Sequence, residues 1–254
     1  MKRFVTMLLW VAVPVFAAEP VQNAFGPGEQ TSYQVTWMGV PTGRAQVTVG
    51  WKTEQFGQPV WPILCSGETS SLAAAFPVRD RFISYFNPTT QTAVGADFFV
   101  SEGNWKKRER YRYDATAQKA YVTRHVNGKE PYDRDYDIAP NTMDLASAAF
   151  RLRNTPMSIG AVIETPVFTG YKTYQMRVSV EGRETIETQL GSMEVFRTTV
   201  TTDFNGNMKT DGAITMYFTA DAKQLPVRAR AEFALGHVDL DVTRYEPGRT
   251  GGTL

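Results

Sequence analysis

The sequence predicts a mainly β protein: a large antiparallel meander curled into a barrel-like or spiral sheet, with one or two short helices. Three observations support this prediction. The 254 residues include 29 Thr and 24 Val but only 11 Leu, and β-branched residues favour strands whereas Leu favours helices. Several segments alternate apolar and polar residues with a period of two. The turns between them are short, which favours antiparallel neighbours over crossover connections.

The N-terminus predicts an exported protein. Lys2 and Arg3 precede an apolar run, Phe4–Phe16, and Ala17 supplies the small residue that a signal peptidase needs before its cut. A membrane anchor is the alternative, but the run is shorter than the ~20 residues that span a bilayer. We therefore expect a signal peptide in residues 1–17 and a mature protein that is periplasmic or otherwise outside the cytoplasm.

The remaining chain has the composition of one globular domain. Hydrophobic residues make up 42% of the sequence and charged residues 21%, which excludes a disordered chain. We expect a single β domain over residues 18–246, with no transmembrane span, and a flexible Gly-rich tail over residues 247–254. After cleavage, 25 basic and 26 acidic side chains remain. This balance gives no general positive field to attract nucleic acid, so we expect no nucleic-acid partner.

Cys65 is the single cysteine of the chain, which excludes an intramolecular disulfide. An exported protein without disulfides depends on its hydrophobic core. Cys65 lies in the apolar stretch 63–67, and this setting favours a small buried strand residue over a nucleophile.

Alternation and turn residues place the strands. Residues 32–37 and 44–49 alternate apolar and polar side chains on either side of a turn expected at 40–43. The Asn127-Gly128 pair predicts a hairpin turn, because both residues tolerate positive φ. A further turn is expected at 181–183 and another at Asn205-Gly206. The remaining strands are expected at 121–126, 176–180, 184–189, 193–203, 213–220, 227–233 and 238–243.

One segment, Asn141–Arg153, has the spacing of a helix. Asn141 or Thr142 is expected to cap its first turn, and Pro156 prevents its continuation. A helix inside a meander commonly caps or plugs the curled sheet. A second, shorter helix is expected at Ser70–Phe76. The buried stripe of the first helix is expected to comprise Leu145, Ala148, Ala149 and Leu152.

Several stretches form an ordered set along the chain: Phe25–Glu29 with Tyr33, Val35 and Trp37; Gly39 and Gly43; Asp144–Arg153; Gly160; Gly182 and Gly191; and Tyr217–Asp221 with Leu225–Val227. Taken in this order, they resemble the DUF3108 family of exported bacterial proteins of unknown function. The resemblance covers nearly the whole mature chain, roughly residues 25–245. The family commonly has Trp where this chain has Tyr217. The resemblance implies an exported, mostly antiparallel β protein and implies no catalytic residues.

The sequence motifs of common enzyme classes are absent. There is no Gly-x-Gly-x-x-Gly, no phosphate-binding loop, no His-Glu-x-x-His and no Gly-x-Ser-x-Gly. His125 and His237 are the only imidazoles, and two unrelated surface residues are favoured over a shared metal or base. We therefore expect no enzyme activity, metal or cofactor. Two pairs of acids could face each other as in a glycosidase, but a solvated strand face is favoured for both: Asp133 with Asp135, and Asp239 with Asp241.

The charge pattern that indicates a binding site is Trp105–Tyr113. In a strand, one face would carry Lys106, Arg108, Arg110 and Arg112. The other face would carry Trp105, Lys107, Glu109, Tyr111 and Tyr113. Four neighbouring cations repel one another unless something negative lies close to them. Carboxylates of Asp133–Asp137 could supply it, and so could a lipid headgroup or an acidic glycan. These four cations are the expected ligand-binding residues.

Three kinds of function agree with these features. The first, which we favour, is a non-enzymatic envelope protein that binds an amphiphilic or anionic ligand in or beside the curled sheet. The second is an assembly factor that binds other envelope proteins through a sheet edge or the basic strand. The third is a hydrolase whose site is not visible in the sequence. For the first, apolar bulk is available from Trp51, Trp61, Phe98 and Phe99.

Overall fold

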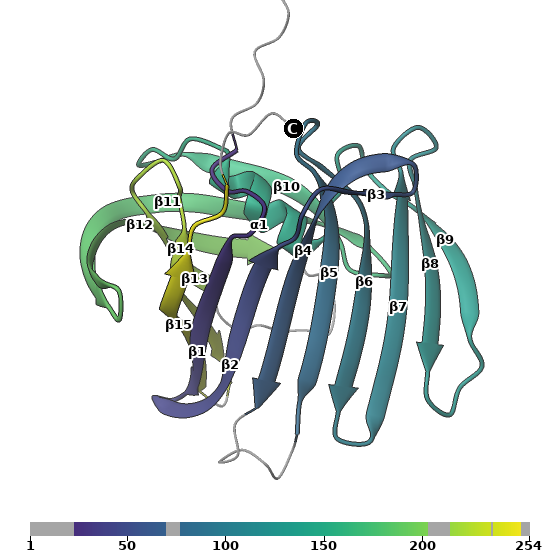
Figure 1. Cartoon of the computed structure of the whole chain (residues 1–254), viewed down its shortest axis with the longest axis horizontal. Helices are drawn as coiled ribbons and strands as arrows, with labels where there is room; N and C mark the ends of the chain where they lie inside the picture. Colours follow the sequence, from purple (N-terminus) through teal and green to yellow (C-terminus); the bar gives the residue numbers. More distant parts are fainter. Residues whose placement is uncertain (1–22, 70–76, 203–213, 235, 250–254) are drawn as a thin grey trace, which may run out of the picture.

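Fifteen antiparallel strands form one sheet in the computed structural model, which describes residues 23–69, 77–202, 214–234 and 236–249 (Figure 1). Along the sheet the order is β10-β11-β12-β13-β14-β15-β1-β2-β4-β5-β6-β7-β8-β9, and β3 pairs only with β4. The expected antiparallel meander is confirmed. The strands are β1 (Gln30–Trp37), β2 (Val40–Val49), β3 (Thr53–Gln55), β4 (Gln58–Thr69), β5 (Arg79–Asn87), β6 (Thr92–Glu102), β7 (Trp105–Asp114), β8 (Lys119–Val126), β9 (Tyr132–Asp137), β10 (Val162–Phe168), β11 (Thr173–Thr188), β12 (Gly191–Thr202), β13 (Ile214–Thr219), β14 (Pro226–Phe233) and β15 (Gly236–Glu246).

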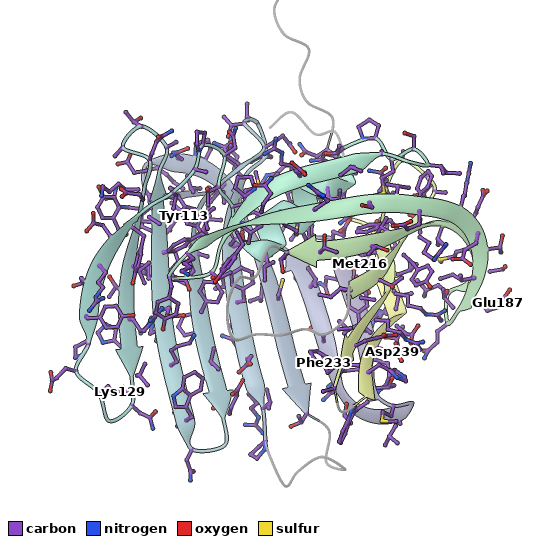
Figure 2. The ribbon with its side chains drawn as sticks, turned by 180° about the vertical axis from the view of Figure 1, so that it is seen from behind. Tyr113, Lys129, Glu187, Met216, Phe233 and Asp239 are labelled. Atoms are coloured by element: carbon purple, nitrogen blue, oxygen red, sulfur yellow. The ribbon has the colours of Figure 1, made fainter. Side chains whose placement is uncertain are left out.

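The sheet curls so that its two halves enclose an apolar interior. Seen from behind, β11 and β12 cross in front of the upper parts of the central strands (Figure 2). Tyr111 and Tyr113 of β7 belong to the same buried cluster as Met176 and Val178 of β11. Because every second residue of a strand points to the same face, the alternation in the sequence becomes this shared core.

Side chains, not backbone bonds, bridge the two edges of the sheet. The edge strands β9 and β10 are not paired with each other. The chain before the helix covers the free edge of β10, where the Met143 N–H donates to Pro166 O at 2.9 Å and the Phe168 N–H donates to Met143 O at 2.8 Å. Between the two edge strands, the ring centroids of Tyr136 in β9 and Phe168 in β10 lie 5.6 Å apart. The other edge, β9, is rich in exposed charges, which discourage pairing with another strand.

The helix α1 (Leu145–Arg153) starts four residues later than the sequence suggested. Asp144 is its N-cap, and the Asp144 carboxylate accepts the Ser147 N–H at 2.9 Å. Asn141 has a φ of 59° and therefore lies in a turn. The expectation that Asn141 or Thr142 caps the helix is wrong, because Thr142 donates its hydroxyl to Ala139 O instead. Within the described residues, no helix is long and apolar enough to cross a membrane.

The expected buried stripe of α1 is partly wrong. Leu145 is 58% exposed, whereas Ala146, Ser147 and Arg153 are buried beside the expected Ala148 and Leu152. A single stripe is typical of a helix that rests on one surface. Here α1 contacts β4, β5, β6 and β10, so polar residues on its other sides are enclosed as well.

Two expected turns are also wrong. The first hairpin turns at Met38 and Gly39, whose φ values are 50° and 81°, and β2 already begins at Val40. The expected turn at 181–183 is a bulge inside β11, where the register shifts between Val180 and Gly182.

Three expectations fall outside the described residues: the signal peptide in 1–17, the short helix at 70–76 and the turn at Asn205-Gly206. Of the expected tail, residues 247–249 are described, and the Arg249 N–H donates to Pro27 O at 2.9 Å.

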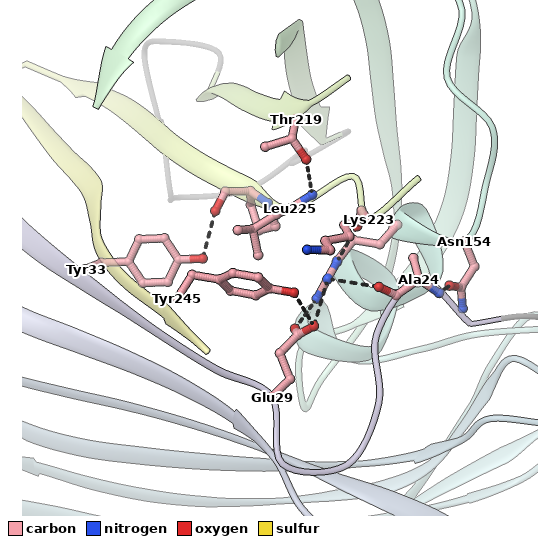
Figure 3. Close-up of polar contacts among 10 residues, drawn as sticks. Ala24, Glu29, Tyr33, Asn154, Thr219, Lys223, Leu225 and Tyr245 are labelled. Atoms are coloured by element: carbon pink, nitrogen blue, oxygen red, sulfur yellow. Dashed lines mark hydrogen bonds and ion pairs between the residues drawn. The ribbon is translucent and has the colours of Figure 1, made fainter. Parts of the chain in front are cut away.

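A buried ion pair connects the segment before β1 to the helix and to β15 (Figure 3). Arg153 donates to both carboxylate oxygens of Glu29, at 2.6 and 3.1 Å, and the two side chains are only 2% and 3% exposed. The Tyr245 hydroxyl donates to the same carboxylate at 3.2 Å. Arg153 Nε donates to Lys223 O at 3.1 Å. The charges are thus paired and hydrogen-bonded, which burial requires.

Replacing Arg153 by Met should lower the free energy of unfolding by about 3–5 kcal/mol, because it leaves the Glu29 carboxylate buried without its partner. Urea unfolding followed by circular dichroism measures this loss. As a control, Arg177→Met removes the exposed pair with Glu164, whose atoms lie 2.7 Å apart, and should cost less than ~1 kcal/mol. Equal losses in both variants would contradict the importance given to the buried pair.

Asp144 should make stability depend on pH. Burial raises the pKa of Asp144 from 3.8 to about 6, against hydrogen bonds from Ser147 and Ser84 that lower it. The folded protein therefore holds a proton that the unfolded chain releases between about pH 4 and pH 6, and the contribution of Asp144 to stability falls as the pH rises through this window.

The variant Asp144→Asn keeps an acceptor for the helix cap and carries no charge. The free energy of unfolding of the variant minus that of the parent should increase by about 1–3 kcal/mol from pH 4 to pH 7. Urea titrations of both proteins at each pH measure this difference. The exposed Asp133→Asn serves as the control. A difference between Asp144→Asn and the parent that stays constant with pH would refute this assignment.

Candidate functional site

The strand β7, called the cationic strand below, places most of its cations on one face and its aromatic residues on the other, as the sequence indicated. In β7, Glu109, Tyr111 and Tyr113 are buried, and this face contributes to the core. The opposite face carries the four expected ligand-binding cations, Lys106, Arg108, Arg110 and Arg112. The register extends this outer face to the neighbouring strands, because Arg108 lies between Phe99 of β6 and His125 of β8.

Two of the four cations have partners within the protein. Arg110 donates to both oxygens of Asp97, at 2.7 and 2.9 Å, and this carboxylate also accepts the Tyr85 hydroxyl at 2.9 Å. The hydrogen bond to Asp97 raises the pKa of Arg110. Arg112 lies 4.2 Å from the ring centroid of Tyr121 and 3.9 Å from the Asp114 carboxylate. Both cations are therefore engaged in structural contacts.

The acids of Asp133–Asp137, one of the two sources of negative charge considered for this strand, form no ion pair with its cations within the described residues. Asp135 and Asp137 of β9 bind Lys119, at 2.8 and 2.9 Å. The strand β8 lies between β7 and β9 in the sheet, so these carboxylates reach β8. A meander gives this order, because consecutive strands lie side by side.

Lys106 and Arg108, in contrast, line a large open hollow of about 1280 Å³. The hollow lies over the ends of β4, β5, β6, β7 and β8 that are nearest the β6–β7 turn, and it reaches inner parts of β1, β2 and β15. Its lining contains two carboxylates, Glu68 and Asp80, together with His125. We call it the cationic hollow, after the eight cations that line it: Arg44, Arg79, Arg81, Lys106, Lys107, Arg108, Lys129 and Arg244.

Three of these eight cations are neutralised locally. Arg44 pairs with Glu68 at 2.5 Å and Lys107 with Glu109 at 2.8 Å. Arg244 pairs with Glu246. The second carboxylate of the lining, Asp80, accepts the Ser101 N–H at 2.9 Å. Among the residues that the structure describes, no carboxylate lies within ion-pair distance of the other five cations, Arg79, Arg81, Lys106, Arg108 and Lys129.

The geometry of the unpaired cations suits an anion. Arg81, Phe99, Arg108 and His125 follow one another on adjacent strands, on the face opposite the core. The Arg108 guanidinium lies over the Phe99 ring at 5.0 Å from its centroid, which orients the donors of a group that binds phosphate and carboxylate in bidentate fashion. Several cations that share a surface without counter-charges repel each other, and a bound anion would relieve this repulsion.

Arg79 and Arg81 are site residues that the sequence reasoning missed. They lie about 25 residues before the cationic strand, and only the pairing of β5 with β6 and of β6 with β7 brings them beside Arg108. A signal was present in the sequence, because two Arg residues two positions apart share one face of a strand.

The other candidate residues occupy structural positions. Cys65 packs beside the core in β4, and burial raises the pKa of its thiol to about 12. His125 and His237 lie on β8 and β15, with six strands between them in the sheet. The paired acids Asp239 and Asp241 bind Arg230 and Arg228. Within the described part of the chain, no three His, Cys, Asp or Glu side chains are placed to hold a metal ion.

These features define a class of protein: an open antiparallel sheet, curled around a filled interior, with a cationic hollow at one end. The chain belongs to the DUF3108 family, described as proteins of unknown function, whose sequence pattern matches residues 32–243. The resemblance drawn from the sequence is thus confirmed. No curated protein matches the chain.

The fold is similar to that of a solved structure, a β-barrel-like protein of the domain of unknown function DUF1849 from Brucella abortus. The TM-score is 0.57 at 8% identity, and the match covers 90% of this chain and 98% of that one. This likeness supports the fold alone.

Two further solved structures have lower TM-scores to this chain. One, a protein from Bacteroides fragilis described as exported and with a YmcC-like fold, has a TM-score of 0.35 at 10% identity and covers 89% of this chain and 99% of that one. The other, from Parabacteroides distasonis and described as a lipoprotein, has a TM-score of 0.34 at 11% identity and covers 90% and 100%.

The free energy of unfolding can test whether Arg110 has a structural role and Arg108 does not. Arg110→Gln leaves the buried Asp97 carboxylate without its charged partner and should lower the free energy of unfolding by about 1–3 kcal/mol. Arg108→Gln changes an exposed side chain without a carboxylate partner and should stay within about 0.5 kcal/mol of the parent. Urea unfolding of the two variants provides the comparison. If Arg108→Gln destabilises as much as Arg110→Gln, both cations are structural and this assignment of roles is wrong.

Proposed function

We propose that this protein is a non-enzymatic binding protein that acts outside the cytoplasm and holds an anionic ligand in the cationic hollow. The ligand class is an anion with several phosphate or carboxylate groups, as in a lipid headgroup or an acidic glycan. The observation that carries the proposal is the group of five exposed cations in one hollow without carboxylate partners among the described residues. The predicted signal peptide supports a location outside the cytoplasm.

Size and chemistry favour a ligand with more than one anionic group. A volume of about 1280 Å³ exceeds the 300–1,000 Å³ that is common for small-molecule sites. The cations also come from several strands, since Arg81, Arg108 and Lys129 belong to β5, to β7 and to the loop after β8. One phosphate cannot reach all of them, whereas a larger anion can contact several at once.

The ligand site lies beside the sheet and not within an apolar interior. The Phe98 ring stacks on Phe82 with centroids 4.4 Å apart, and Trp61 packs on the edge of Phe25 at 5.9 Å. These aromatic side chains fill the core. Phe99 lies below Arg108, and Trp51 is 57% exposed. The interior therefore offers little support for an amphiphile bound inside the curl.

The two other functions have less support. A hydrolase would need a titrating group in a cleft, but Asp144, whose pKa is raised to about 6, is 1% exposed and serves as a helix cap. An assembly factor that binds through a sheet edge would need a free edge. The edge of β10 is partly covered by Met143, and the β9 edge carries charged side chains.

A variant with four substitutions tests the proposal: Arg79→Gln, Arg81→Gln, Lys106→Gln and Arg108→Gln. With inositol hexakisphosphate as a soluble polyanionic probe, the parent should bind, and the variant should bind at least about tenfold more weakly because each lost cation removes an ionic contact. Isothermal titration calorimetry measures both affinities. Binding by the parent should also weaken as the salt concentration rises, since salt screens exposed charges.

A matched control removes the same formal charge elsewhere, through Arg134→Gln, Arg177→Gln, Arg183→Gln and Arg197→Gln. These exposed cations lie outside the hollow. The control should bind the probe as the parent does. An equal loss in both variants would reduce the effect to net charge, and no binding by the parent would refute the proposed function.

A further inference from the structure

An exposed apolar tip lies at the same end of the sheet as the cationic hollow. We define this apolar tip as Trp37, Met38 and Val40 of the β1–β2 hairpin together with Phe233 at the end of β14. The four side chains are 52%, 58%, 60% and 46% exposed. In Figure 2, Phe233 and Lys129 of the hollow both lie toward the lower part of the molecule, whereas the core residue Tyr113 lies near the top.

The two hairpins that form the tip are held together by specific contacts. The strand β1 pairs with β15, with Trp37 opposite Val238, and the Met38 N–H donates to His237 O at 3.0 Å. Gly236 has a φ of 121°, and a Cβ at this position would lie 2.5 Å from Met38 Sδ and 3.4 Å from Trp37 Nε1. Glycine at position 236 therefore permits the close approach of the two turns. The contacts hold the exposed apolar side chains in fixed positions relative to each other.

The apolar tip and the cationic hollow share the strands β1 and β2. Gln34 and Arg44, which line the hollow, lie three and four residues from Trp37 and Val40 along β1 and β2. A further exposed aromatic ring, Trp105, is 41% exposed at the start of β7. The Lys107 amine lies 5.6 Å from the centroid of this ring.

This combination matches the chemistry of a bilayer surface. Trp and other amphipathic aromatic side chains favour the headgroup region of a membrane, and clustered Lys and Arg are attracted to anionic lipid headgroups. Soluble monomers rarely leave neighbouring large apolar side chains exposed without a partner. The tip consists of hairpin turns at the end of a sheet, a shape that can enter a deformable headgroup layer without a complementary groove.

We propose that this end of the protein docks on the surface of a bilayer that contains anionic phospholipid. The apolar tip enters the headgroup layer, and the cationic hollow holds the lipid phosphates beside it. This inference rests on the proposed function of the cationic hollow and names the source of the anion. It also assigns a role to the exposed Trp37, Met38, Val40 and Phe233, which the proposed function does not use.

Sedimentation of the mature chain with lipid vesicles tests the inference. The vesicles contain phosphatidylcholine alone or phosphatidylcholine with about two-fifths phosphatidylglycerol. The parent should sediment with the anionic vesicles and remain in solution with the neutral ones. The double variant Trp37→Ser/Phe233→Ser should bind the anionic vesicles at least tenfold more weakly and still bind inositol hexakisphosphate as the parent does.

The control variant Ile159→Ser/Val162→Ser removes two other exposed apolar side chains, which are 64% and 55% exposed outside the tip. It should bind vesicles as the parent does. If Trp37→Ser/Phe233→Ser does not fold, as judged by circular dichroism, the variant Met38→Ser/Val40→Ser changes the two most exposed positions of the tip and replaces it in the comparison.

The outcomes separate the inference from the proposed function. A parent that binds inositol hexakisphosphate but not anionic vesicles overturns membrane docking and leaves the proposed function standing. A parent that binds neither refutes both. A tip variant that binds vesicles as well as the parent refutes the role of the apolar tip, as does an equal loss in the Ile159→Ser/Val162→Ser control.

Discussion

The two edges of this sheet are not hydrogen-bonded to each other, so packing and hydrogen bonds inside the curl must hold its shape. The helix α1 provides these contacts, because it lies between the two halves of the sheet. At its N-terminus, the Ser84 hydroxyl of β5 donates to the Asp144 cap at 2.8 Å. At its C-terminus, Gln224 from the β13–β14 turn donates to Arg153 O at 2.7 Å. The ion pair of Arg153 with Glu29 adds the segment before β1. Hydrogen bonds at both ends of one helix thus connect strands from the two halves of the sheet, and buried polar groups keep their partners.

This arrangement determines where the described residues leave open space. The helix and the aromatic clusters pack the interior. The cationic hollow lies toward the other end of the central strands, and its lining includes Lys106 and Arg108 from the face of β7 opposite the core. The cations of β7 accordingly differ in their surroundings. Arg110 pairs with the buried Asp97. Arg108 lies over the Phe99 ring and, in the described part of the chain, has no carboxylate partner.

The alternation of side chains made most of the fold predictable from the sequence. Most residues of β1, β2 and β15 were expected in strands because apolar and polar residues alternate there. The helix was predicted, but its cap and part of its buried face were not. Both depend on contacts that only the folded chain makes, with Ser84 near Asp144 and Glu29 near Arg153. Half of the expected cations line the hollow, and Arg79 and Arg81 were missed.

The sequence by itself determined that the chain is a β meander and that Lys106, Arg108, Arg110 and Arg112 share one face of a strand, because both properties follow from a period of two along the chain. Only the tertiary structure decided which of these cations find carboxylates and which line a hollow with Arg81. Strand order and register bring together residues that are far apart in sequence, and no local pattern encodes the distance between side chains on different strands.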